Sequence, residues 1–394
     1  MRIDIESGVR EHREDWPAPG SIDLDLHDLP HASAGIEWWY VNAHLAAADG
    51  RRFGVFAAFF RLNTATAGAE PSYQHFLIWA LTDPEGQRYF PCTRLDRRTP
   101  ETVLAEFDAG RGPGDERIHR AMREVFAQGR VPLPDRLLTR DARVASDRLE
   151  LDFDGDCFAK HGDGSYELDL SSEPGGCSCR LHFVLEKPVI RHGDDGVVRG
   201  VGGERMFYYF SPRCRVDGFL TIDGTPLHVD GSGWYDHEFG EARESNDGLL
   251  PTVGWNWLSA HLENGWDVTA YDLFDKADAS RSHGRWVILV DPVGERHAYR
   301  DFTFEALDSW TSTRTFNEYP TRYRLEVDEA ALSLDIVASQ PEQELITVMS
   351  PPAFWEGLVM LTGVMSGRPI AGQGFIERSG VSTVDTTDDF FASV

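Results

Sequence analysis

The stretch WWYVNAHLAAADGRRFGVFAAFF (residues 38–60) has a counterpart later in the chain, WNWLSAHLENGWDVTAYDLF (residues 255–274). Each stretch begins with an apolar and aromatic run typical of a β-strand. A turn follows, made of an acidic or amide residue and a glycine, and then a second run of the same kind. Two unrelated hairpins can share this pattern by chance. We favour a duplicated β-domain, with one copy beginning near Glu37 and the other near Trp234. The matched positions are Trp38 with Trp255, Tyr40 with Trp257, and Ala43-His44-Leu45 with Ala260-His261-Leu262.

Strand-like runs continue along nearly the whole chain and end at turn dipeptides. Residues 115–128 predict a helix instead, with Asp115 as its cap and Gly129 as its stop. We therefore predict an all-β protein of two antiparallel β-barrel domains with few short helices. The domains should span residues 1–204 and 205–394, divided within the Gly- and Asp-rich stretch 191–204. The turns are Asp49-Gly50, Asp83-Pro84-Glu85-Gly86, Asp223-Gly224, Asn264-Gly265 and Asp291-Pro292-Val293-Gly294.

Composition excludes several functional classes. The net charge of −27 over 394 residues repels phosphate backbones and anionic headgroups, so nucleic acid and membrane surfaces are not expected partners. No apolar run is long enough to span a bilayer, so no integral membrane association is expected, and the charged start MRIDIESGVREHREDW has no apolar signal region. The odd count of five cysteines does not suggest a disulfide framework. We expect a cytoplasmic protein with reduced thiols, and make no prediction of its oligomeric state.

The densest group of reactive side chains lies in GSGWYDHEFG (residues 231–240) and in GWNWLSAHLENGWDVTAYDLFD (residues 254–275). Asp236, His237, Glu238 and Asp272 stand there among aromatic residues. In an aromatic pocket, burial raises a carboxyl pKa, so that the group keeps a proton near neutral pH and delivers it. Aromatic faces also stabilise a nearby cation. The alternative for Asp236 and Glu238, slightly favoured, is a hydrogen-bonded turn that closes one barrel.

Glu37 poses a similar choice, because it directly precedes two tryptophans and a tyrosine. It is either a buried structural partner, for instance of Arg61, or an acid that faces an aromatic pocket; we favour the pocket narrowly. His44 and His261 are most simply strand residues on one face. No metal site is predicted, since His237 and Glu238 are adjacent and point to opposite faces of a strand. No nucleotide, flavin or metal cofactor motif is present, so no cofactor is expected.

Four segments, in their order along the chain, resemble the AttH-like and carotenoid 1,2-hydratase-like proteins. They are EWWYVNAHL, FYYFSPRCRVDGFLTIDGTPLHVDGSGWYDHEFG, GWNWLSAHLENG and WEGLVMLTGVMSGRPIAGQGFIERSG, and they span about residues 37–380. The resemblance implies two lipocalin-like β-domains, in a superfamily that also includes fungal intramolecular Diels–Alderases. Its hydratase-type pattern falls on His237 and on Asp272, next to Tyr271, as proton handlers. This chain has His237-Glu238-Phe239-Gly240 where relatives commonly have His-x-Trp-Gly, which weakens the hydratase analogy.

These considerations yield three hypotheses. The first is a cofactor-independent, Diels–Alderase-like cyclase or isomerase of secondary metabolism that folds a large, hydrophobic, unsaturated polyketide or terpenoid in an inter-domain aromatic cleft. The second is hydration of an isoprenoid or carotenoid double bond by acid-catalysed addition of water. The third is a non-catalytic carrier of a hydrophobic ligand. The candidate catalytic residues are Glu37, His237 and Asp272, and the candidate substrate-binding residues are Trp38, Trp39, Tyr40, Trp234, Phe239, Trp255, Trp257, Tyr271 and Trp355.

Overall fold

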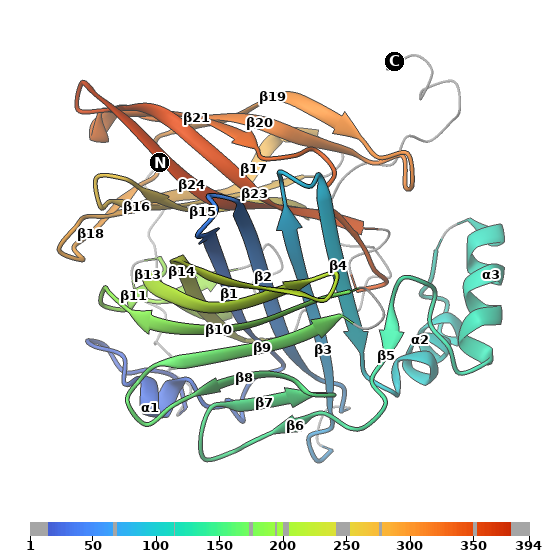
Figure 1. Cartoon of the computed structure of the whole chain (residues 1–394). Coiled ribbons are helices and arrows are strands. Elements are labelled where there is room, and N and C mark those ends of the chain that lie inside the picture. The colour runs from blue at the N-terminus through green and yellow to red at the C-terminus, as the bar shows by residue number, and fades with distance from the viewer. Residues whose placement is uncertain are drawn as a thin grey trace, which may run out of the picture.

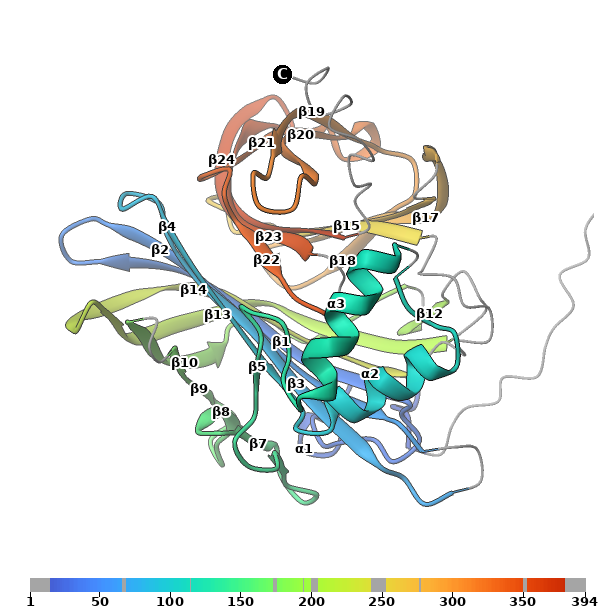
Figure 2. The same ribbon diagram turned by 90° about the vertical axis from the view of Figure 1, so that its right-hand side faces the viewer.

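A computed structural model of the chain describes residues 15–379, except residues 66–68, 114, 173–175, 194, 200–204, 242–252, 276–277 and 350–352. Most of the described chain is strand, and the strands form two curled, almost wholly antiparallel sheets, one above the other in Figures 1 and 2. The predicted all-β architecture of two lipocalin-like domains is confirmed. No helix among the described residues is long and apolar enough to cross a membrane, and all five cysteines are unpaired.

The first sheet has 14 strands, in the order β5-β4-β3-β2-β1-β14-β13-β10-β9-β8-β7-β6, with β11 and β12 added at β13. The strands are β1 (Ile36–Ala47), β2 (Arg52–Asn63), β3 (Tyr73–Asp83), β4 (Arg88–Leu95), β5 (Arg136–Leu137), β6 (Arg143–Val144), β7 (Glu150–Phe153), β8 (Asp156–Lys160), β9 (Tyr166–Ser172), β10 (Cys177–Leu185), β11 (Ile190–Arg191), β12 (Val197–Arg199), β13 (Arg205–Ile222) and β14 (Thr225–Gly240).

The second sheet has ten strands, in the order β18-β17-β16-β15-β24-β23-β21-β20-β19, with β22 added at β23. The strands are β15 (Val253–Leu262), β16 (Asp267–Asp275), β17 (Asp278–Val290), β18 (Arg296–Tyr299), β19 (Thr303–Thr311), β20 (Glu318–Val327), β21 (Leu332–Ala338), β22 (Glu344–Ile346), β23 (Ala353–Met365) and β24 (Arg368–Ser379).

The division between the sheets lies later in the chain than the predicted boundary at residue 204. The long hairpin of β13 and β14 belongs to the first sheet, because β14 returns to pair with β1. The second sheet begins with β15, so Trp234 closes the first domain rather than opening the second. Which sheet a hairpin joins depends on long-range pairing, and no local pattern in residues 205–240 reports it.

The two halves of the internal repeat occupy equivalent places in the two sheets. In each sheet the first strand (β1 or β15) pairs with the second and with the last, which are β2 and β14 in one sheet and β16 and β24 in the other. The two first strands pack against each other across the interface, and three pairs of matched residues touch. Tyr40 meets Trp257 with ring centroids 5.2 Å apart, Asn42 Nδ2 donates to Ser259 Oγ at 2.8 Å, and His44 meets His261 at 5.4 Å.

Local turn chemistry gives the hairpins their predicted positions. The five predicted turns each join two consecutive antiparallel strands. At the turn between β13 and β14, Asp223 and Gly224 both have positive φ, 52° and 76°, the conformation that favours Asp-Gly in a two-residue hairpin loop.

Four short helical elements accompany the sheets: α1 (Leu24–His27), α2 (Thr99–Asp108), α3 (Glu116–Ala127) and the 3-10 turn η1 (Asp328–Ala330). The predicted helix is confirmed as α3, and the Asp115 side chain accepts hydrogen bonds from the N–H groups of Arg117 and Ile118 at its first turn. Helices α2 and α3 lie beside β5 at the edge of the first sheet (Figure 1).

Buried apolar side chains form three clusters. One fills the concave side of the first sheet, one fills the second sheet, and the third lies between the two sheets. The central strands are therefore covered by apolar side chains on both faces.

Candidate active site

Strand β1 has two buried faces, and its side chains alternate between them. Trp39 and Val41 belong to the cluster inside the first domain, whereas Trp38 and Tyr40 pack in the interface with the second sheet. Glu37 lies on the face of Trp39 and therefore points into the first domain. The prediction that Glu37 faces the inter-domain space is wrong.

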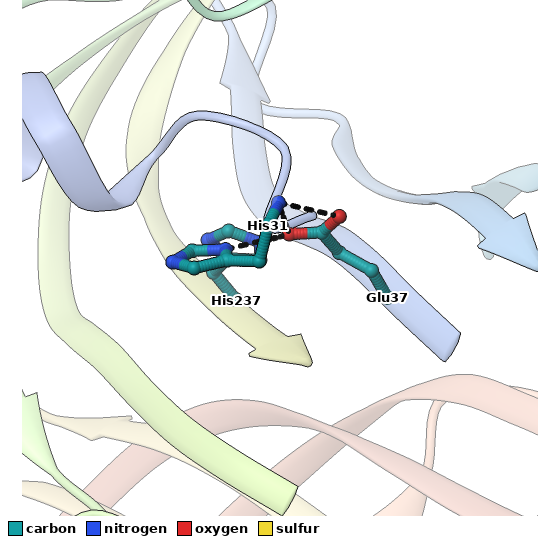
Figure 3. Close-up of side chains that lie close together, drawn as sticks. All are labelled: His31, Glu37 and His237. Atoms are coloured by element: carbon teal, nitrogen blue, oxygen red, sulfur yellow. Dashed lines mark hydrogen bonds and ion pairs between the residues drawn. The ribbon is translucent and has the colours of Figure 1, made fainter. Parts of the chain in front are cut away.

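Glu37 instead joins a compact ionic group, shown in Figure 3. Its Oε1 accepts hydrogen bonds from His31 Nδ1 at 2.8 Å and His237 Nε2 at 3.0 Å, and its Oε2 accepts one from Arg61 Nη1 at 2.7 Å. The main-chain N–H of His31 also donates to the carboxylate. Burial alone would raise the pKa of Glu37, but the hydrogen bonds from His237 and His31 lower it to about 2. Glu37 is thus a buried, ionised anchor, and both imidazoles carry a hydrogen on the nitrogen that faces it.

His237 continues this network to a second buried carboxylate. Its Nδ1 lies 2.9 Å from the hydroxyl of Tyr209, which also lies 2.7 Å from Asp28 Oδ1. The hydroxyls of Tyr166 and Tyr235 donate to Asp28 at 2.7 Å each. Burial lowers the pKa of His237. Because Asp28 directly follows α1, the network ties the N-terminal segment to the inside of the first sheet, which is a structural role.

Among the described residues, two groups of side chains have the composition of a metal site: His31, Glu37 and His237, and the triplet Asp291, Glu295 and His297. In the first group the Arg61 guanidinium already supplies the positive charge that the carboxylate needs. In the second, the Asp291 side chain accepts hydrogen bonds from main-chain N–H groups of its own turn. We therefore assign neither group to a metal.

Asp272 lies inside the second domain, whereas Glu37 and His237 lie inside the first. On β16 it shares a face with Val268 and Ala270, which belong to that domain's core. Ser282 Oγ donates to its carboxyl at 3.2 Å, and burial raises its pKa against the opposing charge of Arg285. The three candidate catalytic residues are thus split between two domain interiors.

Most of the candidate substrate-binding residues do come together, in the interface. Three of the nine lie elsewhere: Trp39 and Phe239 in the first domain's core, and Trp355 in the second's. Trp38, Trp255 and Tyr271 are partly accessible, whereas the others in the interface are buried. The six interface residues are Trp38, Tyr40, Trp234, Trp255, Trp257 and Tyr271.

Four carboxyl groups accompany these aromatic rings. Asp236 Oδ2 accepts hydrogen bonds from Trp234 Nε1 at 2.9 Å and from the Tyr208 hydroxyl at 3.1 Å. Glu356 Oε1 accepts one from the Tyr40 hydroxyl at 2.7 Å. The four acids are Asp236 and Glu238 on β14, Glu356 on β23 and Glu377 on β24.

All four carboxyls hold a proton more strongly than usual. Burial raises the pKa of Asp236 to about 8 and that of Glu377 to about 7. Burial, with the negative charge of neighbouring carboxyls, raises the pKa of Glu238 and of Glu356 well above the usual range. None of the four forms an ion pair with a basic side chain among the described residues. Without a cationic partner, Asp236, Glu238 and Glu356 therefore stay mostly neutral at pH 7, whereas Glu377, with a pKa of about 7, is divided between its neutral and ionised forms.

Among the described residues, Glu238 differs from the other three acids in having no hydrogen bond. It is also partly accessible. It lies opposite Trp38 on β1 and Tyr208 on β13 in the strand register. Glu238 and Glu377 both raise the pKa of Tyr271, so their carboxyls lie near that ring. The arrangement is a neutral carboxylic acid, free to donate its proton, beside partly accessible aromatic faces.

Sequence reasoning placed Asp236 and Glu238 in a turn and overlooked Glu356 and Glu377. Asp236-His237-Glu238 is instead the interior of β14, and strand alternation directs the two acids to the interface and His237 to the opposite face. The available signal was the two-residue spacing of the acids within a strand of aromatic residues. Glu356 and Glu377 carry the same signal that drew attention to Glu37, an acid inside an apolar run.

Residues 126–381 match the model of a protein family described as AttH-like. The sequence matches no curated protein.

Solved structures share the fold over most of this chain. A putative AttH from Nitrosomonas europaea superposes with a TM-score of 0.69 and 23% identity, over 93% of this chain and 100% of that one. Kievitone hydratase from Nectria haematococca gives a TM-score of 0.64 and 14% identity, over 91% of this chain and 92% of that one. The structure of CghA with Sch210972 gives a TM-score of 0.51 and 12% identity, over 93% of this chain and 95% of that one.

Proposed function

The chain belongs to the AttH-like family, and we propose that it is a cofactor-independent cyclase or isomerase of a large, apolar, unsaturated polyketide or terpenoid. The reaction begins when a neutral carboxyl in the interface protonates a carbon–carbon double bond. The observation that carries this proposal is Glu238, a partly accessible acid without a hydrogen-bond partner and with a raised pKa.

The chemistry follows from the neighbours of Glu238. Its proton goes to one alkene carbon, and the other alkene carbon becomes a cation. The rings of Trp38, Trp255 and Tyr271 stabilise positive charge through their electron-rich faces. The π electrons of a second double bond then close a ring, or the cation shifts within the chain. Loss of a proton to a carboxylate completes the cycle, so the product has the mass of the substrate.

Glu377 acts on this step through charge, because its pKa of about 7 leaves an ionised fraction of this carboxyl at neutral pH. The ionised Glu377 makes it harder for Glu238 to ionise, because like charges repel in a poorly solvated site. The coupling keeps the proton on Glu238 until substrate arrives. Glu377, which also stays partly accessible, is placed to take a proton back at the end and to return it to Glu238.

Hydration is the second candidate, and the structural likeness to kievitone hydratase over 91% of this chain favours testing it. The first step is identical. The cation is then captured by water, so the product is heavier by one water and contains a new C–O bond.

The test begins with metabolites of the source organism with and without this gene. The accumulating compound is then incubated with the purified protein in D2O. We expect a product that is isobaric with the substrate when formed in water and one mass unit heavier, with one carbon-bound deuterium, when formed in D2O, and a large loss of turnover in Glu238→Gln. The exposed Glu305 provides the control, since Glu305→Gln should retain full activity.

Each other outcome points elsewhere. A product heavier by one water establishes hydration. An isobaric product without deuterium, formed equally well by Glu238→Gln, refutes protonation and indicates a pericyclic closure. Binding of the compound in a stoichiometric amount, with release unchanged, identifies a carrier.

A further inference from the structure

A second site lies at the opposite end of strands β1 and β15 from the four acids. Here a pocket of about 330 Å³ opens between the two sheets, and His44, His261, Arg52 and Arg213 are among the residues that line it. The matched contacts between Asn42 and Ser259 and between Tyr40 and Trp257 close the interface between this pocket and the acids. The pocket is therefore separate from the site of the proposed reaction.

His261 is held by a buried carboxylate. Its Nδ1 lies 2.8 Å from Asp267 Oδ1, and Arg213 Nη2 lies 2.7 Å from the same oxygen. Burial would raise the pKa of Asp267, but the hydrogen bonds and charges of His261 and Arg213 lower it. Because Asp267 is ionised, its oxygens can only accept hydrogen bonds. Nδ1 of His261 therefore carries the hydrogen, and Nε2 is left to accept a hydrogen bond from another partner. Nε2 is buried and has no such partner among the described residues.

His44 lacks partners on both ring nitrogens. The side chain is 2% exposed, and neither Nδ1 nor Nε2 has a hydrogen bond within the described chain. Burial lowers its pKa well below the usual value, so the ring is neutral. It therefore presents one N–H donor and one lone pair. Each buried polar group left unpaired costs about 1–3 kcal/mol, so the pair of imidazoles is built to receive a polar group.

The charges near the two rings indicate what else that group carries. Behind His261, the single negative charge of Asp267 is paired with two cations, Arg213 at 2.7 Å and Lys187 at 2.7 Å, so the inner wall keeps a net positive charge. Arg52 is exposed, and its guanidinium forms no ion pair with an acid in the described structure; its side-chain contact is with the sulfur of Met360 at 3.9 Å. Two exposed acids, Asp230 and Glu263, also line the pocket.

We propose that this pocket binds a small hydroxylated carboxylate. The ligand's hydroxyl accepts a hydrogen bond from the N–H of His44 and donates one to Nε2 of His261. Its carboxylate lies against Arg213 and Arg52. A hydroxyl is the simplest group that satisfies both rings at once, since it is both a donor and an acceptor.

The test uses the full chain with L-malate as the probe and succinate, which lacks only the hydroxyl, as the matched control. Titration calorimetry should give millimolar or tighter binding of malate, and succinate should bind at least about tenfold more weakly, because it loses both hydrogen bonds of the hydroxyl in a buried site. In parallel, nitrogen-15 NMR should show malate shifting the ring nitrogens of His44 and His261.

Variants make the assignment specific. Arg52→Gln changes an exposed residue, so the fold is kept, and malate should bind more weakly. His44→Phe should abolish the preference for malate over succinate, while His228→Phe, at an exposed position of β14, should not. Glu238→Gln should leave malate binding unchanged, which separates this site from the proposed reaction. Equal binding of both acids, or no shift at either ring at high millimolar malate, overturns the proposal and leaves water as the partner of the two imidazoles.

Discussion

Replacing Glu37 by glutamine should destabilise the protein without any direct effect on the interface. In the folded chain the pKa of Glu37 falls from 4.5 to about 2, and one pKa unit corresponds to about 1.4 kcal/mol. The ionised form therefore contributes about 3 kcal/mol to folding at pH 7. Losing it leaves the Arg61 guanidinium, 2.7 Å away, buried without its anion, and breaking such a pair costs about 3–5 kcal/mol.

Urea unfolding followed by tryptophan fluorescence measures this loss. Glu238→Gln is the matched control, because Glu238 is already neutral and glutamine resembles a protonated carboxyl in shape. We expect Glu37→Gln to lower the free energy of unfolding by about 3 kcal/mol and Glu238→Gln to leave it almost unchanged. A loss below about 1 kcal/mol, the size of an ordinary exposed ion pair, would refute the role of Glu37 as an anchor.

The dependence on pH gives an independent check of the same reasoning. A carboxyl whose folded pKa is depressed stabilises the fold above its unfolded pKa and loses this effect as the pH falls toward its folded pKa. The difference between the wild type and Glu37→Gln should be full above pH 4.5 and shrink between pH 4.5 and about 2. A difference that does not change over this range would contradict the ionised state.

Asp236→Asn should have the opposite sign. Its folded pKa of about 8 exceeds the ordinary aspartate pKa of 3.8, so the wild type loses stability as the pH rises between these values. The variant should be more stable at pH 7 by up to about 4 kcal/mol; equal unfolding curves at pH 7 would show that Asp236 is ionised. Gly231→Ala should lower the free energy of unfolding by about 3 kcal/mol, because a Cβ there would lie 1.8 Å from the carbonyl oxygen of His44. Gly162→Ala is the neutral control in the same urea experiment, because a Cβ at residue 162 would have no atom within 4 Å. Asp115→Ala should accelerate hydrogen exchange at the first turn of α3, because the side chain caps it; unchanged exchange would mean that packing alone holds this helix end.

Local chemistry made much of the fold predictable from sequence. Turns such as Asp223-Gly224 require positive φ, and few residues other than Asp, Asn and Gly adopt it readily. The match of Trp38 with Trp255 in the internal repeat also reflected the structure, because β1 and β15 occupy equivalent places in the two sheets. The sheets divide later than residue 204 because the partner of β14 is β1, and residues so far apart in sequence leave no local trace of their pairing.

The site was harder to predict because its strands have two buried faces. A strand with one buried and one exposed face alternates apolar and polar residues, so its sequence shows which side chains face the core. Strand β1 is buried at nearly every position, so the pattern could say that Glu37 and Trp39 share a face but not which one. The same holds for Asp236 and His237: alternation separates them, and only the docking of the second sheet tells which one meets a substrate.

The contact of matched residues across the interface bears on how this protein could have arisen. In a dimer of identical subunits, residues on the twofold axis touch their own copies, as His44 touches His261 and Asn42 touches Ser259 here. Every substitution in such a dimer appears twice and keeps the two sides alike. Once the two copies are joined in one gene, each side mutates alone. Asp236, opposite Tyr40, has an acidic counterpart in Glu377, opposite Trp257, but the place opposite Trp255, which corresponds to that of Glu238, holds Ser379. That freedom therefore let one copy alone carry the acid Glu238. An asymmetric substrate calls for such an asymmetric surface, which no pair of identical subunits can present on its axis.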